Sequence, residues 1–548
     1  MGISINLEVS ESVTEKEWSK VYEESLELVK AFPLAERGTI SYAGHKVVCA
    51  VRTSEREIHY CGRIRRGWRA EMDYDTLNMA EGYCLFKDFV DSEGINRDAG
   101  DAIMGVLPNL DFMDYDWQGE KYRHTHSLWG DKTQGEPYHM YLLSIACMIE
   151  DRLGEKVFIH GDITQGQCRE AVEMANQYLK NPIRIPARCD MERLYERIRK
   201  LPLNENEKIE VFEFLYLGNR DETFYDFIRA HFNADIIQAY WEKRFAGSMI
   251  GTIGFIMDLK AYLSSGAGLE ELCSIVRMED GEGNPQYEKF IYALMDSKLH
   301  IKEKNTEDYL DIQQENEQPY SIWEIMANFV YGGAHNRKAE RYIPIDEIRQ
   351  ALRSGLGDKC NTDRYIDQYL AKEAAAPEID FFKENIAKEE MDEMIDADPA
   401  EVFTQCMDKR MEGMQDLREQ YDNLDYDDLI DYREGNTIVP PLKEAVVKSF
   451  QFYNKVTREK KYKGLMKKSH EERCIFLIER NDQLLLKDKD WMHIFANMEQ
   501  HPENYERYYP MVRVEADKRS LNLLVIALVL NDDLYESAKE WSKEYEVS

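Results

Sequence analysis

Histidines in the first 200 residues are the side chains best suited to metal chemistry. His124 and His126 are two residues apart, so they share a face if residues 122–128 form a strand. With His160 or Asp162 they could supply three ligands to a metal and leave one position open. Isolated histidines are more often structural, and no HExxH motif is present. We therefore expect no metal and no cofactor, and we expect that these four side chains do not converge.

A strand–turn–helix segment around residue 160 has the outline of a phosphate-binding loop. Residues 157–159 predict a buried strand, and Gly161 and Gly166 follow at the spacing of such a loop. Gln167 occupies the position of the required lysine, so no fixed cation faces a phosphate. Thr164 precedes Gln167 by three residues, the spacing of a capping box. We expect a structural turn, although a bare helix N-terminus could still hold an anion.

Four arginines within seven residues, Arg63, Arg65, Arg66 and Arg69, stand beside Trp68. Arginine binds carboxylates and phosphates through paired hydrogen bonds and stacks on aromatic rings. One interpretation is a hairpin end that binds an anionic ligand or partner. The other is that these arginines pair with the many carboxylates of the chain.

Local catalytic motifs are absent from the sequence. It contains no GxSxG nucleophile elbow, no dinucleotide-binding glycine pattern, no kinase motif set and no EF-hand. This absence excludes only enzymes whose sites can be recognised from short motifs, and it leaves the catalytic residues unknown.

Composition describes an acidic globular protein. The 548 residues include 104 acidic and 70 basic side chains, which give a formal charge of −34, and 43% are hydrophobic. This charge argues against a general nucleic-acid binder, which needs a basic footprint. It fits a basic protein partner, or a role of the charge in solubility alone.

Cysteine spacing and hydropathy indicate a cytosolic location. No two of the ten cysteines are closer than twelve residues, so there is no CxxC motif, and we expect reduced thiols. The N-terminus lacks the features of a signal peptide. The most apolar run, residues 521–530, is too short to cross a bilayer, so no membrane contact is expected.

Residues 373–434 carry nearly half of the charge imbalance. The segment contains 21 acidic and 6 basic residues, a net charge of −15, and its densest cluster is Asp425, Asp427, Asp428 and Asp431. Charged helix faces often serve solubility alone. The segment also contains large apolar residues, which favour an exposed apolar patch rimmed by carboxylates that binds a basic protein. These apolar residues include Phe381, Phe382, Met391, Met394 and Phe403.

Periodicity changes along the chain and predicts the fold class. Short period-2 runs occur early, at residues 40–42, 46–51 and 57–64, and Ala43-Gly44 predicts a tight turn between the first two; runs at helical spacing dominate later. Residues 73–112 are poorly periodic and predict loops and short helices. We expect an α+β N-terminal domain with a small mixed or antiparallel sheet, followed by a large, mostly α-helical region. The predicted boundaries are an α+β domain over 1–200, a helical domain over 201–370 and an acidic helical domain over 371–548.

Three functions fit these features. The preferred one is a cytosolic acidic protein that binds and neutralises a basic protein partner, in the manner of an immunity protein or an inhibitor. The second is a metal-dependent or anion-binding enzyme whose site lies in the N-terminal α+β domain. The third is a helical scaffold subunit of a defence or regulatory complex.

Overall fold

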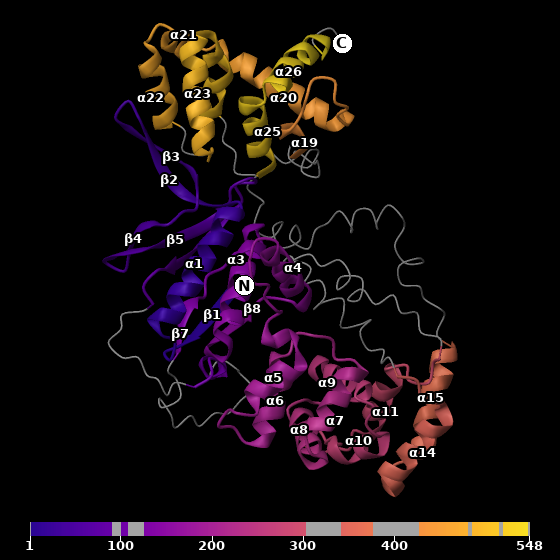
Figure 1. Cartoon of the computed structure of the whole chain (residues 1–548). Helices are drawn as coiled ribbons and strands as arrows, with labels where there is room; N and C mark the ends of the chain where they lie inside the picture. Colours follow the sequence, from indigo (N-terminus) through magenta and orange to yellow (C-terminus); the bar gives the residue numbers. More distant parts are fainter. Residues whose placement is uncertain are drawn as a thin grey trace. The chain divides into compact units, whose positions relative to one another are not determined.

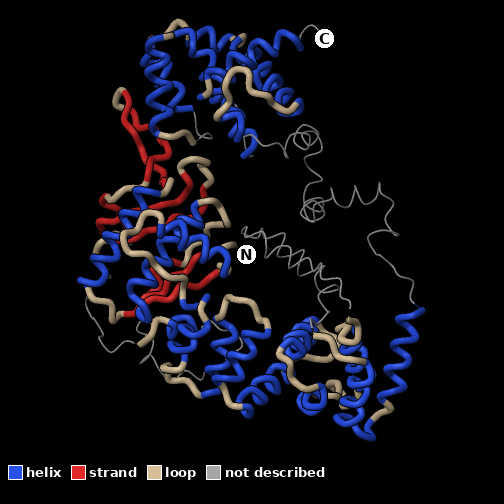
Figure 2. The backbone as a smooth tube through the Cα atoms, turned by 45° about the vertical axis from the view of Figure 1, so that its right-hand side comes forward, coloured by secondary structure: helices blue, strands red, loops and turns tan. Residues whose placement is uncertain are grey.

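A computed structural model describes residues 2–89, 100–107, 125–302, 341–375, 427–480, 485–513 and 519–545. Two antiparallel sheets lie in the N-terminal part, and the rest of the described chain is predominantly helical (Figures 1 and 2). The predicted fold class is therefore confirmed. The strands are β1 (Ile5–Ser10), β2 (Leu34–Tyr42), β3 (His45–Arg52), β4 (Arg56–Tyr60), β5 (Arg63–Asp73), β6 (Met79–Phe86), β7 (Thr125–Trp129) and β8 (Val157–Gly161).

The helices differ widely in length. They are α1 (Glu15–Ala31), α2 (Ile103–Val106), α3 (Tyr138–Leu153), α4 (Gln165–Asn176), α5 (Met191–Ile198), α6 (Glu205–Leu215), α7 (Glu222–His231), α8 (Ala234–Ala246), α9 (Ile253–Ser264), α10 (Leu269–Ile275), α11 (Tyr287–Asp296), α14 (Ile345–Leu356), α15 (Thr362–Ala375), α19 (Asp427–Ile430), α20 (Pro440–Thr457), α21 (Lys460–Leu465), α22 (His470–Arg480), α23 (Asp488–Gln500), α24 (Tyr505–Tyr508), α25 (Arg519–Leu530) and α26 (Asp532–Tyr545). Among the described helices, none is both long enough and apolar enough to span a bilayer.

The chain folds into two compact units that are interleaved along the sequence. The N-terminal unit comprises residues 1–32, 55–68 and 83–398, and the C-terminal unit comprises residues 33–54, 69–82 and 399–548. The boundary between the units passes through β5 and β6. Local sequence patterns instead predict three consecutive regions, because such patterns cannot show that early strands join late helices.

The N-terminal unit is built on a three-stranded sheet with the order β7-β1-β8, antiparallel at both pairings. Ile5, Leu7 and Val9 are fully buried on one face of β1, as expected for a strand that helices cover on that face. The helix α3 packs against β1 and β8, and α1 packs against α3. Thr14 and Glu17 form a capping box at the start of α1.

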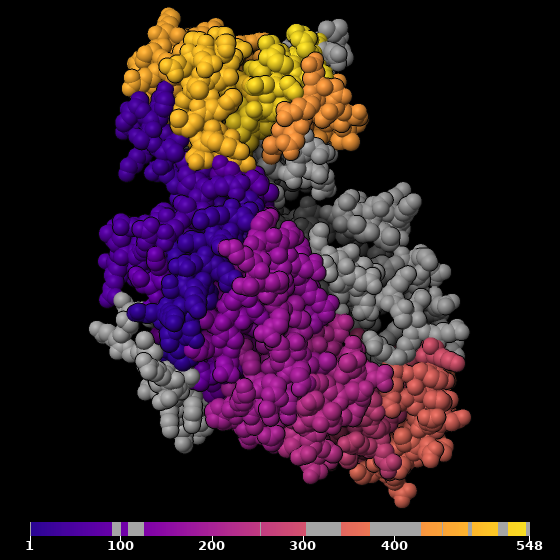
Figure 3. Space-filling model, viewed as in Figure 1, coloured from indigo at the N-terminus to yellow at the C-terminus, as the bar shows by residue number. Residues whose placement is uncertain are grey.

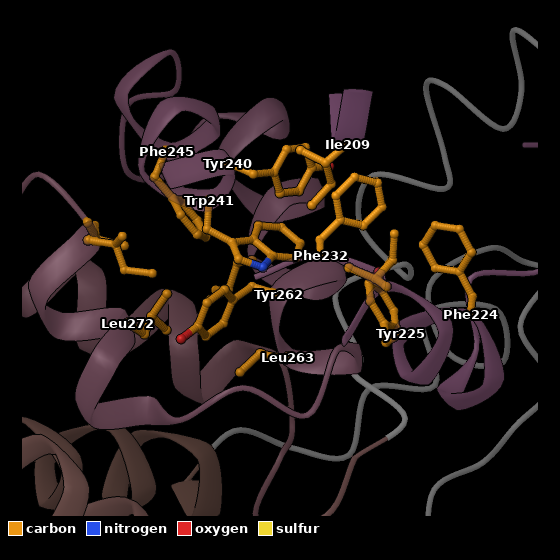
Figure 4. Packing of buried hydrophobic residues seen from close by; sticks show 14 of the residues in the cluster. Ile209, Phe224, Tyr225, Phe232, Tyr240, Trp241, Phe245, Tyr262, Leu263 and Leu272 are labelled. Atoms are coloured by element: carbon orange, nitrogen blue, oxygen red, sulfur yellow. The ribbon is translucent and has the colours of Figure 1, made fainter. Parts of the chain in front are cut away.

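An aromatic core fills the helical part of this unit. Trp241 lies 5.2 Å from Tyr262, ring centre to ring centre, in an edge-on contact, and Phe245 lies 5.9 Å from Tyr262 (Figure 4). Figure 4 shows these rings pointing toward one another from α8 and α9. Edge-on and offset contacts are the favoured geometries for aromatic pairs.

Buried charges connect these helices to the sheet. The Arg197 guanidinium donates to both carboxylate oxygens of Asp101, at 2.9 and 2.6 Å, and to the Val157 carbonyl at 3.0 Å. The buried Glu150 carboxylate accepts from the amides of Ile159 at 3.0 Å and Ala187 at 2.7 Å. Because buried charges need such partners, this network ties α2, α3, α5 and β8 together.

The C-terminal unit combines the β2–β3 hairpin with α19 to α26. A tight turn at Ala43 and Gly44, both at positive φ, joins the two strands as the sequence predicts. Tyr42 stacks on Phe495 of α23 at 4.0 Å, and its hydroxyl lies 2.8 Å from Nε2 of His470 on α22. In Figure 3 the indigo hairpin lies directly against the yellow and orange atoms of these helices.

Two local predictions are wrong. Residues 57–64 are not one strand, because Cys61 and Gly62 form a tight turn at positive φ between β4 and β5. Residues 73–112 are not only loops and short helices, because β6 occupies Met79–Phe86 and pairs with β5. In the second sheet the strand order is β3-β2-β5-β4, with β6 paired to β5.

Candidate functional site

The turn after β8 has a structural role. Gly161 adopts a φ of +106°, and a Cβ added there would lie 2.7 Å from the Ser4 carbonyl oxygen, so glycine is required. Asp162 accepts hydrogen bonds from the amide of Ser4 at 2.9 Å and from its hydroxyl at 3.0 Å. Thr164 and Gln167 form the predicted capping box at the start of α4. The loop therefore closes onto β1 through its own side chains.

The structure separates the two described histidines of the predicted metal site. His160 pairs across the sheet with Asn6 of β1, and His126 pairs with Val9. Directly opposed residues share a face, and side chains three residues apart on one strand point to opposite faces. His126 and His160 therefore leave opposite faces of the sheet, and Asp162 is engaged with Ser4.

His124 lies outside the described residues, so the four-residue site is not fully placed. His126 lies 3.4 Å from a carboxylate oxygen of Glu11. Within the described ranges, no group of three or more His, Cys, Asp or Glu side chains is arranged to hold a metal ion.

A further histidine, His139, is buried, whereas His160 is half-buried, and both rings are neutral near pH 7. Burial lowers the pKa of His160 to about 4, and the nearby Arg188 charge adds to this effect. The Asn6 side-chain amide nitrogen lies 3.3 Å from His160 Nδ1. Burial also lowers the pKa of His139 to about 4, with its Nδ1 2.6 Å from the Thr133 hydroxyl.

The arginine cluster is divided by the structure. Trp68 is fully buried, and its indole N–H donates to Ser25 of α1 at 3.1 Å, so it is not an exposed stacking platform. Arg69 forms an ion pair with Glu71 at 3.0 Å. Arg66 forms an ion pair with Glu55, also at 3.0 Å. Arg63 and Arg65 lie on the face of β5 opposite to Arg66, and Arg65 donates to the Asp88 carbonyl at 2.5 Å.

Phe86 is the aromatic partner that sequence reasoning missed. The Arg65 guanidinium carbon lies 4.1 Å from the Phe86 ring centre, and the Tyr60 ring lies 5.1 Å from it. An arginine held on a ring in this way keeps its donors directed outward. The apolar alternation of residues 79–86 could have revealed β6, and with it the position of Phe86.

The described part of the acidic segment is firmly attached to the C-terminal helices. Leu429 and Tyr432 are buried, whereas Asp431 between them is exposed. The Asn531 side-chain amide donates to the carbonyls of Leu429, Ile430 and Tyr432 at 3.2, 2.9 and 2.9 Å. The anchor from α25–α26 therefore holds α19 and the turn after it in one conformation.

A second acidic group lies beside this anchor. The amide of Glu434 donates to the carboxylate of Asp533 at 3.3 Å, which places residues 431–434 next to the start of α26. Asp427 and Asp428 lie within α19, while Asp425 and the predicted apolar residues between 381 and 403 lie outside the described residues.

The described residues thus place Arg63 at the exposed end of the β4–β5 hairpin and an exposed Asp431 beside the anchor of α19, and no set of catalytic groups is identified among them. No known protein family, curated protein or solved structure matches this chain.

Proposed function

We propose that the protein is an acidic binding protein that engages a basic protein partner through the acidic cluster at residues 425–434. The whole chain carries a formal charge of −34. Such a charge steers a basic partner toward the protein and accelerates encounter. A neutralising role of the immunity or inhibitor kind in the cytosol is the simplest function of this type.

The observation that carries the proposal is the anchoring of α19 by Asn531. Three carbonyls accept from one amide, and its oxygen accepts from the Leu534 amide at 3.0 Å. A purely solubilising carboxylate needs no fixed position. A carboxylate on a fixed backbone loses less conformational freedom when it meets a partner, so more of the interaction energy appears as affinity.

Exposure of Asp431 next to buried Leu429 and Tyr432 supports the same conclusion. The apolar residues secure the segment, and the charge between them faces solvent. Charged pairs at the rim of an interface mainly affect the association rate and its salt dependence. The proposal therefore predicts a kinetic effect for the aspartates.

The test begins with recovery of the basic partner by co-purification from the native host. Association is then measured at low and high ionic strength for the unchanged protein and for a variant with Asp425, Asp427, Asp428 and Asp431 replaced by Asn. We expect a slower association rate and a weaker salt dependence in the variant, with the fold unchanged.

A matched control removes the same number of charges elsewhere. Glu170, Glu173, Glu279 and Glu282 are exposed residues of the N-terminal unit. Their replacement by Gln changes the net charge equally and should leave most of the salt response in place. If both quadruple variants bind the recovered partner with equal rates, the cluster serves solubility alone and the proposal is wrong.

A further inference from the structure

A strongly basic stretch lies in the C-terminal unit, at the end of α20 and along α21 (Figure 1). Residues 455–468 contain seven lysine and arginine residues and one glutamate, a net charge of +6, in a chain whose formal charge is −34. Such a local reversal of sign favours the binding of an anionic ligand. The basic residues are Lys455, Arg458, Lys460, Lys461, Lys463, Lys467 and Lys468.

Three of these lysines lie on one face of α21 and of the turn that follows it. Lys460, Lys463 and Lys467 are separated by three and four residues, which places them one above another on a helical surface. The Lys467 amide donates to the Gly464 carbonyl at 3.2 Å, so the helical turn continues to this residue. Like charges at this spacing destabilise a helix, so the arrangement favours a binding role over a structural one. We call these three lysines the lysine face.

The lysine face keeps its charge. Lys460, Lys463 and Lys467 are exposed, and none of them forms an ion pair with a residue that the structure describes. The neighbouring Lys468 differs, because its ammonium group donates to the Glu472 carboxylate at 3.1 Å. Hydrogen bonds at the start of α22 hold Glu472 in this position, so it neutralises Lys468 and not the lysine face.

Three other carboxylates lie near α21. Glu459 is its N-cap residue, and Glu471 is exposed in the first turn of α22. Burial, and after it the charge of Glu506, raises the pKa of Tyr462 to about 12, so Glu506 lies within reach of α21. Residues 455–473 contain eight cations and three carboxylates, and with Glu506 the balance is eight against four. The surface therefore stays positive, with a net charge of +4.

A buried cation lies under this surface. Arg473 of α22 is 5% exposed, and among the described residues its Nε atom has no hydrogen-bond partner and its guanidinium forms no ion pair. Its Nη1 atom lies 3.8 Å from the Met466 sulfur at the end of α21, and its guanidinium carbon lies 5.6 Å from the Tyr505 ring centre. A buried charge without a counter-ion costs free energy. An anion on the lysine face would offset that cost.

We propose that the lysine face, with Arg473 beneath it, binds the polyphosphate chain of a small ligand. Lysine is a compact point charge that suits phosphate, whereas carboxylates pair best with the planar fork of arginine. The axial distance from Lys460 to Lys467 is about 10.5 Å at 1.5 Å per residue. Three flexible lysine side chains can converge from this length of helix on a chain of two or three phosphate groups.

A small polyphosphate fits these features better than a nucleic acid or a membrane does. Tyr462 lies among the lysines, but it is half-buried and its ring stacks on Tyr505 at 6.0 Å, so it offers no free platform for a base. Within residues 455–473, all of which the structure describes, no large apolar side chain is exposed for insertion into a membrane. The overall charge of −34 repels a long polyanion more strongly than a short one. This inference does not rest on the proposed function of the acidic cluster.

The experiment titrates the full-length protein with inorganic triphosphate in a calorimeter, without divalent cations. We expect saturable binding that weakens as salt is added. The triple variant Lys460→Gln/Lys463→Gln/Lys467→Gln should lose roughly tenfold or more in affinity, because three charges that face the ligand disappear.

Two matched variants accompany the triple variant. Lys16→Gln/Lys20→Gln/Lys30→Gln removes three exposed lysines of α1, where five glutamates accompany them, and should alter the affinity by less than about twofold. Glu472→Gln releases Lys468 and should raise the affinity by about two- to threefold. Glutamine preserves the hydrogen bonds at the start of α22, and a gain of affinity cannot result from misfolding.

Three further probes distinguish the source of the negative charge. ATP tests whether a nucleoside adds to the phosphate chain, a deoxythymidylate oligomer tests a nucleic acid, and a polyglutamate peptide tests carboxylates. Equal affinity for inorganic triphosphate and ATP shows that the chain alone is recognised, and tighter binding of ATP identifies a nucleoside polyphosphate as the ligand. Either result, with weaker binding in the triple lysine variant, supports the inference.

The opposite outcomes overturn it. If the oligomer or the peptide binds as tightly as triphosphate at equal charge concentration, the surface is a generic anion surface. No binding of triphosphate, or equal affinity in the triple variant and the α1 control, overturns the inference as well. If the triple variant does not fold, Glu472→Gln decides, because tighter binding supports the inference and unchanged or weaker binding overturns it.

Discussion

The histidines of the three-stranded sheet and the arginines of the β4–β5 hairpin were both selected by residue type and spacing, and the fold treats them differently. His126 and His160 leave opposite faces because their partners on β1, Val9 and Asn6, differ by an odd number of residues. Arg63 and Arg65 differ by an even number and share a face. Two side chains therefore share a face of the sheet only when their positions in the strand register differ by an even number of residues.

The two groups also differ in burial. His139 is buried and His160 is half-buried, and both are neutral near pH 7, with hydrogen bonds to Thr133 and Asn6. Arg63 is exposed, and Arg65 is half-buried against the Phe86 ring. The histidines therefore act on stability through their protonation, whereas the hairpin arginines lie near solvent, and each of the following predictions tests one side of this contrast.

The largest effect should come from protonation of the buried His139. The folded-state pKa of His139 is about 4, against an ordinary value near 6.5. The folded protein prefers the neutral ring, so this stabilisation is complete above pH 6.5 and is lost as the pH falls toward 4. At pH 4.5 the loss at His139 alone should be roughly 2–3 kcal/mol.

Urea unfolding between pH 7 and 4.5, with hydrogen exchange of α3 as the local readout, measures this loss. His139→Gln cannot titrate and should flatten the pH dependence, whereas His59→Gln, at an exposed position, should not. Identical pH profiles for His139→Gln and the unchanged protein would show that the ring is not the titrating group.

Gly67→Ala should have the next largest effect because it disrupts the close packing of β5 against β6. The new methyl group meets the Leu85 carbonyl at 2.3 Å, and a backbone atom cannot move aside cheaply. We expect a loss of about 1–3 kcal/mol in unfolding free energy. Gly281→Ala is the control, because nothing lies within 4 Å of its added Cβ. Equal unfolding free energies for the two variants would contradict the close approach of β5 and β6.

Phe86→Leu should have a smaller effect on stability than Gly67→Ala, but it should clearly increase the mobility of the Arg65 side chain. It removes the ring under Arg65 and beside Tyr60, and such cation–π and aromatic pairs contribute about 0.5–1.5 kcal/mol each. Leucine keeps most of the apolar volume. Side-chain NMR of Arg65 should show faster motion in the variant, and unchanged Arg65 dynamics would argue against the stack.

Elements whose causes are local were predictable from sequence. Thr164 with Gln167 and Asp190 ahead of α5 are capping signals within one turn, and both helices begin where those residues stand. The turn at Ala43 and Gly44 was likewise found. The change from strands to helices along the chain reflects hydrophobic periodicity, which is also local.

Features caused by distant contacts were not predictable. Tyr42 and Phe495 are separated by more than 400 residues, and their stacking places an early hairpin in the C-terminal unit. The density of arginine in the sequence identifies the cluster, but it does not identify Phe86, because residues 73–112 predict loops and short helices and not the strand β6. The anchoring of α19 depends on Asn531, and no pattern near residue 430 points to that residue.

The smallest effect should come from Arg66→Gln, and this makes it the sharpest comparison within the hairpin. Arg66 and Arg65 are neighbours of the same type, but Arg66 faces the other side and forms an ion pair with Glu55 at 3.0 Å. Its side chain is 57% exposed, and exposed pairs are weakened by solvent and by salt. We expect no measurable change in the urea midpoint, and hydrogen exchange of β4 and β5 should stay as in the unchanged protein. The Glu55 carboxyl, whose pKa is held below its ordinary range mainly by the hydrogen bond from Arg66, should titrate closer to its ordinary value in the variant. A large loss of stability would instead show that the Arg66–Glu55 ion pair contributes substantially to the stability of the hairpin.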